Sequence, residues 1–419
     1  MGAGLVADWA ACVRGRGYAA RAAAPGVPRR SSAVDNRCSP PAAHHSGRMP
    51  PRPIADVTPV ARGGVFTVAE AMAAGYTRAQ IRHRVATGVW RGLRRGVLVA
   101  DEAARRASAD PRSEHRVLTA AALVTHANTW ASHESAAVGH GLEFLREPDL
   151  HVVRLTRPVD ACSRLRRTAG CEIPCCGLPP VHRNDARRTT TPARTVVDLA
   201  RRLPLLDAVV VADSAMRRRG VRTDDLARVL ESCRGWPGSA NAAAAVGLAD
   251  PLAESVLESL SRVELVGHGL TPETQCWLVG PDGRALRVDF LWWPERTVGE
   301  ADGLGKYVKY GARPTMDPLK VEKIRQEVLE DWGLEVVRWG MREMRRDSAG
   351  VAGRVRRGFA RSLVRQEIRA RNGEVEVFRR LPCAPWTSHQ CGSTRPLTAD
   401  STAPRTHDRL TAAFRSAAV

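Results

Sequence analysis

GVFTVAEAMAAGYTRAQIRHRVATGVWRGLRRGVLV, residues 64–99, is the stretch of this sequence whose local folding signals are most complete. A Thr-x-x-Glu motif begins at Thr67 and a Thr-x-x-Gln motif at Thr77, and both fit the capping box that opens an α-helix. Gly75 lies between them and can adopt the left-handed backbone that ends a helix. The stretch therefore predicts a helix, a short turn and a second helix.

The second predicted helix is basic, and a basic hairpin follows it. Three apolar residues are expected to anchor the helix: Ala79, Ile81 and Val85. Three arginines are left to project outward: Arg78, Arg82 and Arg84. Residues 89–90 and 96–99 predict two strands, joined by a tip that carries Arg94 and Arg95. Such a helix can enter the major groove of DNA while the wing contacts flanking phosphates, although a solvated Arg-rich helical hairpin is the alternative.

This segment resembles the winged-helix domain of AbiEi-type antitoxins of type IV toxin–antitoxin systems. The resemblance covers about 50 residues and rests on F-T-x-x-E-A, G-x-T, I-x-x-x-V-x-x-G-x-W and a later G-V. In that family the domain is understood to bind operator DNA. The resemblance therefore implies double-stranded DNA and a cognate toxin as partners.

Composition sets the limits within which these signals are interpreted. The length of 419 residues suits two or three domains, and a hydrophobic content of 43% excludes wholesale disorder. The formal net charge of +20 is carried mostly by arginine. Two explanations are open: a partner that carries phosphates, or the arginine-rich codon usage of a GC-rich genome. The sequence has no apolar stretch long enough to span a membrane, and its ten cysteines fit no zinc spacing. We therefore expect a cytoplasmic bacterial protein with free thiols.

The composition divides the chain into five parts, which predict an α+β or α/β multidomain protein. They are a disordered or over-extended leader (1–48), a winged helix (50–100), a mixed α/β middle segment (101–248), a restriction-endonuclease-like domain (249–346), and a basic helix with a disordered tail (347–419). We expect residues 49–346 to fold without the two ends. The middle segment is interpreted as a scaffold.

The neighbours Ser132 and His133 suggest a nucleophile and its base. Adjacent residues of a helix do not face each other, however. We therefore interpret Ser132 as a helix cap, with His133 in the first turn.

Residues 284–292 and 297–302 predict two β-strands joined by a short turn. A hairpin symmetric about that turn pairs Leu291 with Val298. The same register places Asp289 opposite Glu300, with the two side chains on one face of the sheet and about 5 Å apart at Cβ. Asp302 follows two residues later on that same face.

Three carboxylates on one patch repel one another and raise each other's pKa unless a cation joins them. Mg²⁺ prefers oxygen ligands and often takes only one or two carboxylates, so we expect a divalent cation such as Mg²⁺ at this patch. Upstream, Glu254 and Glu258 share a helical face with Arg262. We interpret Glu258 and Arg262 as a surface ion pair, and Glu254 as the member that joins the site.

A helix with Glu, a hairpin with Asp and Glu-x-Asp, a helix and a strand together resemble the PD-(D/E)XK nuclease fold, and more closely the Vsr endonuclease-like domain. The match covers about 95 residues, carried by Ala253-Glu254-x-x-Leu257, Gln275, Val288-Asp289-Phe290, Glu300-x-Asp302-Gly303 and residues 333–338. The resemblance implies that Asp289 and Glu300 bind metal and that Glu254 lies nearby. Asp302 occupies the position of the usual lysine, and Lys306 is a substitute four residues later.

Three classes of function stay open at this point. The first is a Mg²⁺-dependent DNA endonuclease that uses five candidate residues: Glu254, Asp289, Glu300, Asp302 and Lys306. The second is a non-enzymatic antitoxin and repressor that uses the last domain to form a homodimer or to control a toxin. The third is an RNA-acting protein, but the sequence lacks the aromatic-rich strand pair that would support it.

Overall fold

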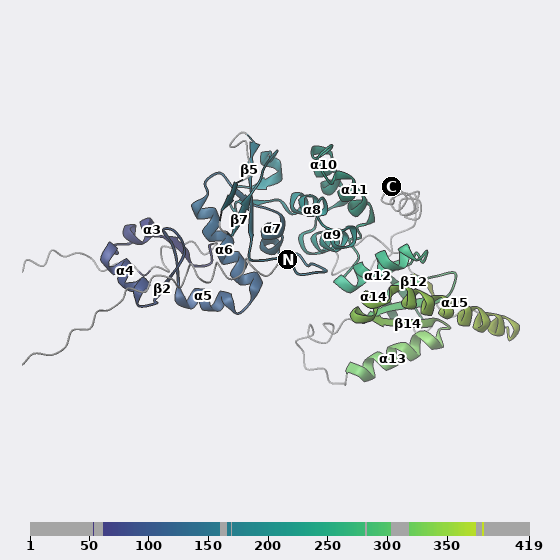
Figure 1. Cartoon of the computed structure of the whole chain (residues 1–419). Coiled ribbons are helices and arrows are strands. Elements are labelled where there is room, and N and C mark those ends of the chain that lie inside the picture. Colours follow the sequence, from purple (N-terminus) through teal and green to yellow (C-terminus); the bar gives the residue numbers. More distant parts are fainter. Residues whose placement is uncertain are drawn as a thin grey trace, which may run out of the picture. The chain divides into compact units, whose positions relative to one another are not determined.

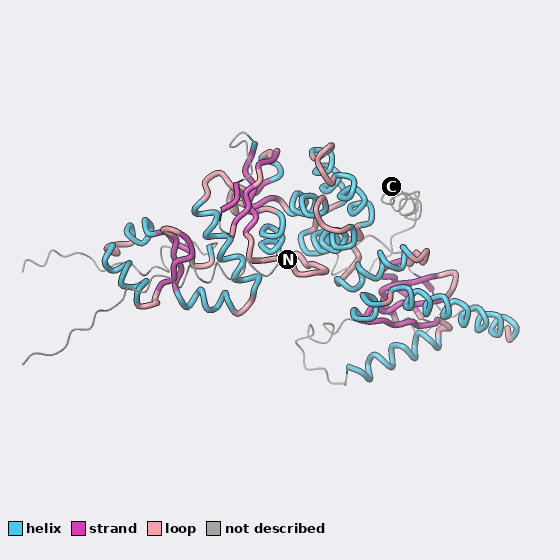
Figure 2. The backbone as a smooth tube through the Cα atoms, viewed as in Figure 1, coloured by secondary structure: helices cyan, strands magenta, loops and turns pink. Residues whose placement is uncertain are grey.

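The computed structural model describes residues 53, 62–159, 166–168, 170–280, 283–302, 318–373 and 379–380. Over these residues the chain is a mixed α/β structure with three separate sheets, which agrees with the predicted class (Figure 1). Figure 2 shows that helices accompany the strands of every sheet. In the described part of the chain, no helix combines the length and apolar character that a bilayer span requires. The leader 1–48 and residues 381–419 lie outside the described residues.

The first module contains two short helices and a three-stranded antiparallel sheet in the order β1-β3-β2. Its elements are β1 (Val65–Thr67), α3 (Val68–Ala73), α4 (Arg78–Ala86), β2 (Trp90–Arg94) and β3 (Val97–Ala100). Both predicted capping boxes are confirmed, one between Thr67 and Glu70 and the other between Thr77 and Gln80. Gly75 has a φ of +99° in the turn between the helices. The predicted order of helix, turn, helix and hairpin is therefore confirmed.

The apolar anchors of this module differ from the predicted ones. Ile81 is buried, but Ala79 is exposed and Val85 is 39% exposed. The core is instead completed by three aromatic rings in edge-to-face contact: Phe66, Tyr76 and Trp90. These rings bury more apolar area than alanine or valine, and they come from outside the helix whose periodicity was used for the prediction.

The two helices that follow residue 100 complete the other side of this sheet. They are α5 (Asp101–Ser108) and α6 (Pro111–Thr125). Four of their residues pack in one apolar cluster with Val65, Val97 and Val99 of the sheet: Ala104, Ala107, Val117 and Ala121. The predicted boundary at residue 100 therefore falls within a single packing unit.

The middle segment combines a seven-stranded sheet with a bundle of helices. Its strands are β4 (Trp130–Ala131), β5 (Val153–Pro158), β6 (Arg166–Thr168), β7 (Cys171–Ile173), β8 (Cys175–Cys176), β9 (Arg183–Asn184) and β10 (Thr189–Thr190). Its helices are α7 (His133–His140), α8 (Pro192–Ala200), α9 (Leu205–Arg219), α10 (Thr223–Ser232) and α11 (Ser239–Leu248), with a 3-10 turn at Pro180–His182. The helices bury a large apolar cluster in which α8 and α9 are central.

The last domain is a five-stranded sheet with helices on both faces. Its elements are α12 (Val256–Gly267), β11 (Glu273–Val279), β12 (Ala285–Trp292), β13 (Thr297–Asp302), α13 (Pro318–Asp331), β14 (Glu335–Gly340), α14 (Met341–Arg346), α15 (Ser348–Arg371) and β15 (Arg379–Arg380). The strand order is β14-β13-β12-β11-β15, and only β13 and β14 run parallel. One apolar cluster joins α12, α14 and α15 to the sheet, and a second joins α13 to it.

The hairpin of β12 and β13 follows the predicted register over part of its length. Leu291 pairs with Val298, as expected. The ladder between the two strands does not reach Asp289 and Glu300. Instead, the backbone N–H of Ala301 donates to the Asp289 carboxylate at 2.9 Å. A side chain thus bonds to the backbone of the neighbouring strand where the backbone ladder ends.

Helix α15 is part of the last domain, although the sequence assigned it to a separate tail. Val351, Ala352 and Val355 are fully buried in the cluster that covers the sheet. Arg361 of the same helix pairs with Glu335 of β14 at 2.5 Å. The predicted boundary at residue 346 therefore cuts through a packed core, because the apolar face of α15 covers strands that precede it in sequence.

The packing of α15 is tested by two valine substitutions in the same helix. Val355→Ala should lower the free energy of unfolding by about 2 kcal/mol, since it removes buried methyl groups and leaves a cavity. Val364 is 58% exposed, so Val364→Ala should change it by no more than about 0.5 kcal/mol. Urea denaturation measures both variants. Equal, small effects would show that α15 does not pack on the sheet.

Candidate functional site

Three buried carboxylates in the last domain define the candidate site. Glu258 of α12, Asp289 of β12 and Glu300 of β13 are 3%, 7% and 4% exposed. Acidic side chains are seldom buried without partners, because removing a charge from water costs several kcal/mol. The surrounding structure must therefore supply donors to each of them.

Gln275 of β11 supplies a donor to two of these carboxylates from a single amide group. Its Nε2 donates to Glu258 Oε2 at 2.8 Å and to Asp289 Oδ1 at 3.2 Å. Strand β11 pairs with β12 on both sides of Gln275, yet the φ of this residue is +53°. Such a left-handed backbone costs a non-glycine residue about 1 kcal/mol or more. The hydrogen bonds to Glu258 and Asp289 therefore hold the Gln275 side-chain amide in position although the backbone of this residue is strained.

Glu258 is fixed at the start of α12 by a capping arrangement. Ser255 Oγ donates to Glu258 Oε1 at 2.8 Å, and the backbone N–H of Glu254 donates to Oε2 at 2.8 Å. The Ser-x-x-Glu spacing is a capping-box signature, so the sequence held a signal for this residue. The cap itself is the hydrogen bond from the backbone N–H of Glu258 to Ser255 Oγ at 3.2 Å. The further bond from Gln275 connects the start of the helix to the sheet.

The contacts of Glu254 and Glu258 differ from those that the sequence predicted. The side chain of Glu254 is 49% exposed and pairs with Arg287 at 2.8 Å. Arg262 does not form the predicted surface pair with Glu258; it is buried and pairs with Asp213 of α9 at 2.8 Å. Helical spacing indicates which residues share a face, but the tertiary neighbours of that face decide the pairing.

The two carboxylates of β13 lie next to arginines. The guanidinium of Arg325 in α13 is 2.8 Å from Glu300 Oε1. Asp302 is partly exposed, and one of its oxygens lies 3.7 Å from the guanidinium of Arg338 in β14. These cations offset part of the acidic charge that the sequence predicted. Lys306 lies outside the described residues.

Asp289 and Glu300 fit the predicted ion in donor type. Carboxylate oxygens suit Mg²⁺, which often takes one or two of them and completes its shell with water and phosphate oxygens. Across the described ranges, no three His, Cys, Asp or Glu side chains are grouped so as to hold a metal ion. A Mg²⁺ ion held by Asp289 and Glu300 would therefore need further oxygen ligands, such as water or phosphate oxygens, that the described residues do not supply.

The basic residues of the first module divide into two groups. All five predicted arginines are at least partly exposed: Arg78, Arg82 and Arg95 are exposed, and Arg84 and Arg94 are half-buried. Arg84 differs from its prediction, because its guanidinium lies over the rings of Tyr76 and Trp90, 5.2 and 5.3 Å from their centroids. The exposed arginines belong to α4 and to the hairpin tip, where a polyanion has access to them.

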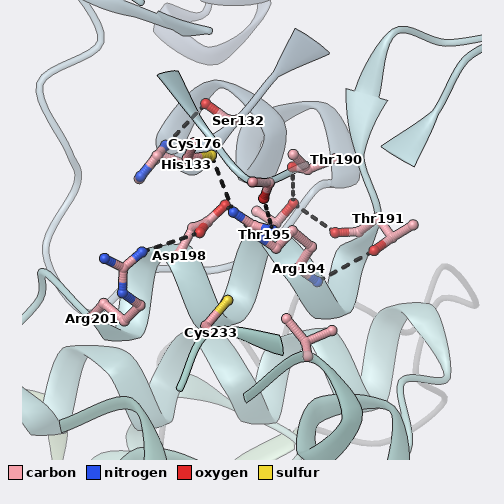
Figure 3. Close-up of polar contacts among 12 residues, drawn as sticks. Ser132, His133, Cys176, Thr190, Thr191, Arg194, Thr195, Asp198, Arg201 and Cys233 are labelled. Atoms are coloured by element: carbon pink, nitrogen blue, oxygen red, sulfur yellow. Dashed lines mark hydrogen bonds and ion pairs between the residues drawn. The ribbon is translucent and has the colours of Figure 1, made fainter. Parts of the chain in front are cut away.

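A second buried polar cluster lies in the middle segment (Figure 3). Arg194 and Asp198 of α8 form an ion pair at 2.9 Å, and Arg194 also donates to Cys176 Sγ at 3.3 Å. Burial raises the pKa of the Cys176 thiol, which disfavours a nucleophilic thiolate. Cys175 is disulfide-bonded, in contrast to the predicted free thiols. The bonds of Arg194 connect β8 to α8 and indicate a structural cluster.

Ser132 and His133 contact each other, which the helical argument did not predict. Ser132 occupies the N-cap position of α7, as expected, but its side chain makes no capping hydrogen bond, and its Oγ lies 2.9 Å from His133 Nδ1 (Figure 3). The contact forms because His133 has a φ of +49°, outside the helical range. Burial lowers the pKa of His133 and favours its neutral form.

No protein-family model matches this sequence. Two uncharacterized proteins of Mycobacterium tuberculosis, from strains CDC 1551 and H37Rv, are each 29% identical over 229 residues, which cover 54% of this chain and 80% of the relative. A crystal structure of the RV2827C protein of Mycobacterium tuberculosis gives a TM-score of 0.29 at 17% identity, covering 49% of this chain and 75% of that one.

Burial lowers the pKa of four histidines in the middle segment: His115, His133, His140 and His182. At pH values between these lowered pKa values and the ordinary histidine pKa of about 6.5, the unfolded chain binds more protons than the folded chain. The free energy of unfolding therefore rises with pH in this interval. His115→Gln should therefore reduce the loss of unfolding free energy between about pH 7.5 and 5.5. Urea titrations at several pH values measure this loss. The exposed His83→Gln variant is the control, and an identical loss in both variants would contradict the assignment.

Proposed function

We propose that this chain binds duplex DNA through its first module and that its last domain hydrolyses DNA phosphodiesters with the help of Mg²⁺. The observation that carries the proposal is the strained Gln275, whose amide joins the buried carboxylates of Glu258 and Asp289. Backbone strain and buried charges concentrate at functional sites, because the surrounding fold must hold them in place. The resemblance of this domain to Vsr-like nucleases supports the same interpretation.

Each residue of the site has a distinct task in this proposal. Asp289 and Glu300 would hold the ion, and when bound it would polarise the phosphodiester and activate water. Gln275 orients the Asp289 carboxylate, and Glu258 holds Gln275. Arg325 lies beside Glu300 with its side chain 35% exposed, so it can present positive charge to a phosphate.

The proposal for the first module is a winged helix. Helix α4 would enter the major groove and the hairpin of β2 and β3 would be the wing, as in the AbiEi-type domain that it resembles. The exposed Arg78 and Arg82 lie on α4, and Arg95 lies at the hairpin tip. Contacts from such residues to phosphates provide affinity that depends strongly on salt.

One observation favours a second candidate function, a non-enzymatic regulator. Arg325 pairs with Glu300, so a protein cation already lies beside one of the proposed metal ligands. A domain of this kind serves an antitoxin or repressor by binding a second copy or a cognate toxin while the first module binds the promoter. The measurement of DNA cleavage separates the two candidates.

Nicking of supercoiled plasmid in Mg²⁺ or Mn²⁺ tests the enzymatic proposal. Asp289→Asn and Glu300→Gln should each reduce the nicking rate by about 10- to 100-fold or more, since both would remove a metal ligand. Glu335→Gln is the matched control, because Glu335 is also a buried carboxylate of the sheet but pairs with Arg361 of α15. Absence of nicking by the parent protein, with DNA binding intact, would instead support the regulator.

The salt dependence of duplex binding tests the wing. Replacing Arg94 and Arg95 with alanine should weaken binding to all sequences and lower the slope of log K against log salt by about two. The double alanine variant of Arg105 and Arg106 is the control, because these exposed α5 residues pair with Asp101 and Glu102. An unchanged slope in the Arg94 and Arg95 variant would rule out the wing contact.

A further inference from the structure

A buried polar network lies next to the candidate site and extends into the middle segment. Asp213 of α9 is completely buried and accepts from the backbone N–H of Asp250 at 2.7 Å and from Arg262 at 2.8 Å. The Asp250 carboxylate accepts from Thr274 Oγ1 at 2.8 Å and lies 3.6 Å from Arg262 Nε. We call these four residues, Asp213, Asp250, Arg262 and Thr274, the positioning network.

The positioning network holds both elements that carry the site. Arg262 lies four residues after Glu258 in α12, and Thr274 immediately precedes Gln275 in β11. Helix α12 also contributes Val263 to the apolar core of the middle segment. The strand that holds Gln275 is thus hydrogen-bonded to Asp250 through Thr274, and the helix that holds Glu258 forms an ion pair with Asp250 through Arg262.

We propose that the positioning network sets the distance between Glu258 and Gln275, and thereby the orientation of the Asp289 carboxylate. Its four members are positioning residues, because they act on the site through Glu258 and Gln275. The consequence for DNA cleavage rests on the proposed function, whereas the effect on the Gln275 amide does not. The middle segment then contributes to the geometry of the site through Asp213, in addition to the scaffold role that the sequence predicted.

Because the backbone of Gln275 is strained, the position of its side chain depends strongly on the positioning network. A residue with a φ of +53° keeps that conformation only while its neighbours over-determine it. Thr274 is fixed by Asp250, which is fixed in turn by Asp213 and Arg262. Releasing any of these contacts lets the backbone relax, and a shift of about 1 Å is enough to misplace a catalytic carboxylate.

The substitution Asp213→Asn tests the network in the full chain. The asparagine amide accepts through one oxygen only, so either Arg262 or the N–H of Asp250 loses its acceptor. The matched control is Asp198→Asn, which breaks a buried ion pair with Arg194 in the same helical core. No bond from Asp198 reaches α12 or β11 within the described residues. Arg262→Lys is a second, milder variant that keeps the charge but loses the planar fork.

The side-chain amide signals of glutamine provide a readout that is independent of catalysis. The chain has five glutamines, so 15N-glutamine labelling gives five resolvable amide groups, and Gln275→Glu identifies the one at the site. Asp213→Asn and Arg262→Lys should both shift the Gln275 amide signals by more than a linewidth. Asp198→Asn should leave them in place even if it lowers the melting temperature. Nicking of plasmid by the two network variants should fall about 10-fold or more.

The outcomes separate this inference from the proposed function. Shifted Gln275 signals in a parent protein that does not nick DNA would support the positioning network and remove the enzymatic proposal. Unshifted Gln275 signals in both network variants would overturn the network, whether or not the parent protein nicks DNA. Equal shifts in Asp213→Asn and Asp198→Asn would also overturn it, because the effect would then report general loosening of the core.

Discussion

The buried carboxylate of Asp213 constrains the second half of the described chain. A charge without access to water must be matched by nearby donors, and here the donors are Arg262 of α12 and the backbone of Asp250. Meeting that requirement fixes α12 against α9. The same helix contributes Leu257 and Leu260 to the core of the last domain, so its position is set by two cores at once.

Helix α12 carries Glu258, the first residue of the candidate site. Glu258 lies one turn before Arg262 and points to Gln275, whose amide reaches Asp289 on the next strand. None of these polar groups would be tolerated singly in a buried position. Together they satisfy one another, which explains how the sheet accepts a left-handed residue within a strand. Well-packed apolar side chains at Glu258, Gln275 and Asp289 would stabilise the domain as much as this buried polar group does.

The first module shows a similar dependence on later sequence. Its two capping boxes form locally, but its sheet is covered on one side by α5 and α6, which lie beyond the predicted boundary. The exposed arginines of α4 and the hairpin are therefore presented by a module whose core includes helices from the next segment. The half-buried Arg84 differs from the exposed arginines of α4, because its guanidinium lies over the ring of Trp90.

The sequence by itself determined the features that depend on neighbours in the chain. The capping boxes at Thr67 and Thr77 form within a single turn of helix, and the register of Leu291 with Val298 follows from a short connection. The sequence also predicted that Asp289 lies opposite Glu300 in one hairpin, but the backbone ladder ends before this pair, and their burial is known only from the structure. Only the tertiary structure decided that Glu258 contacts Gln275 while Glu254 pairs with Arg287, because both partners lie in other strands. Burial and pairing across long separations are set by packing, and a local pattern carries no information about them.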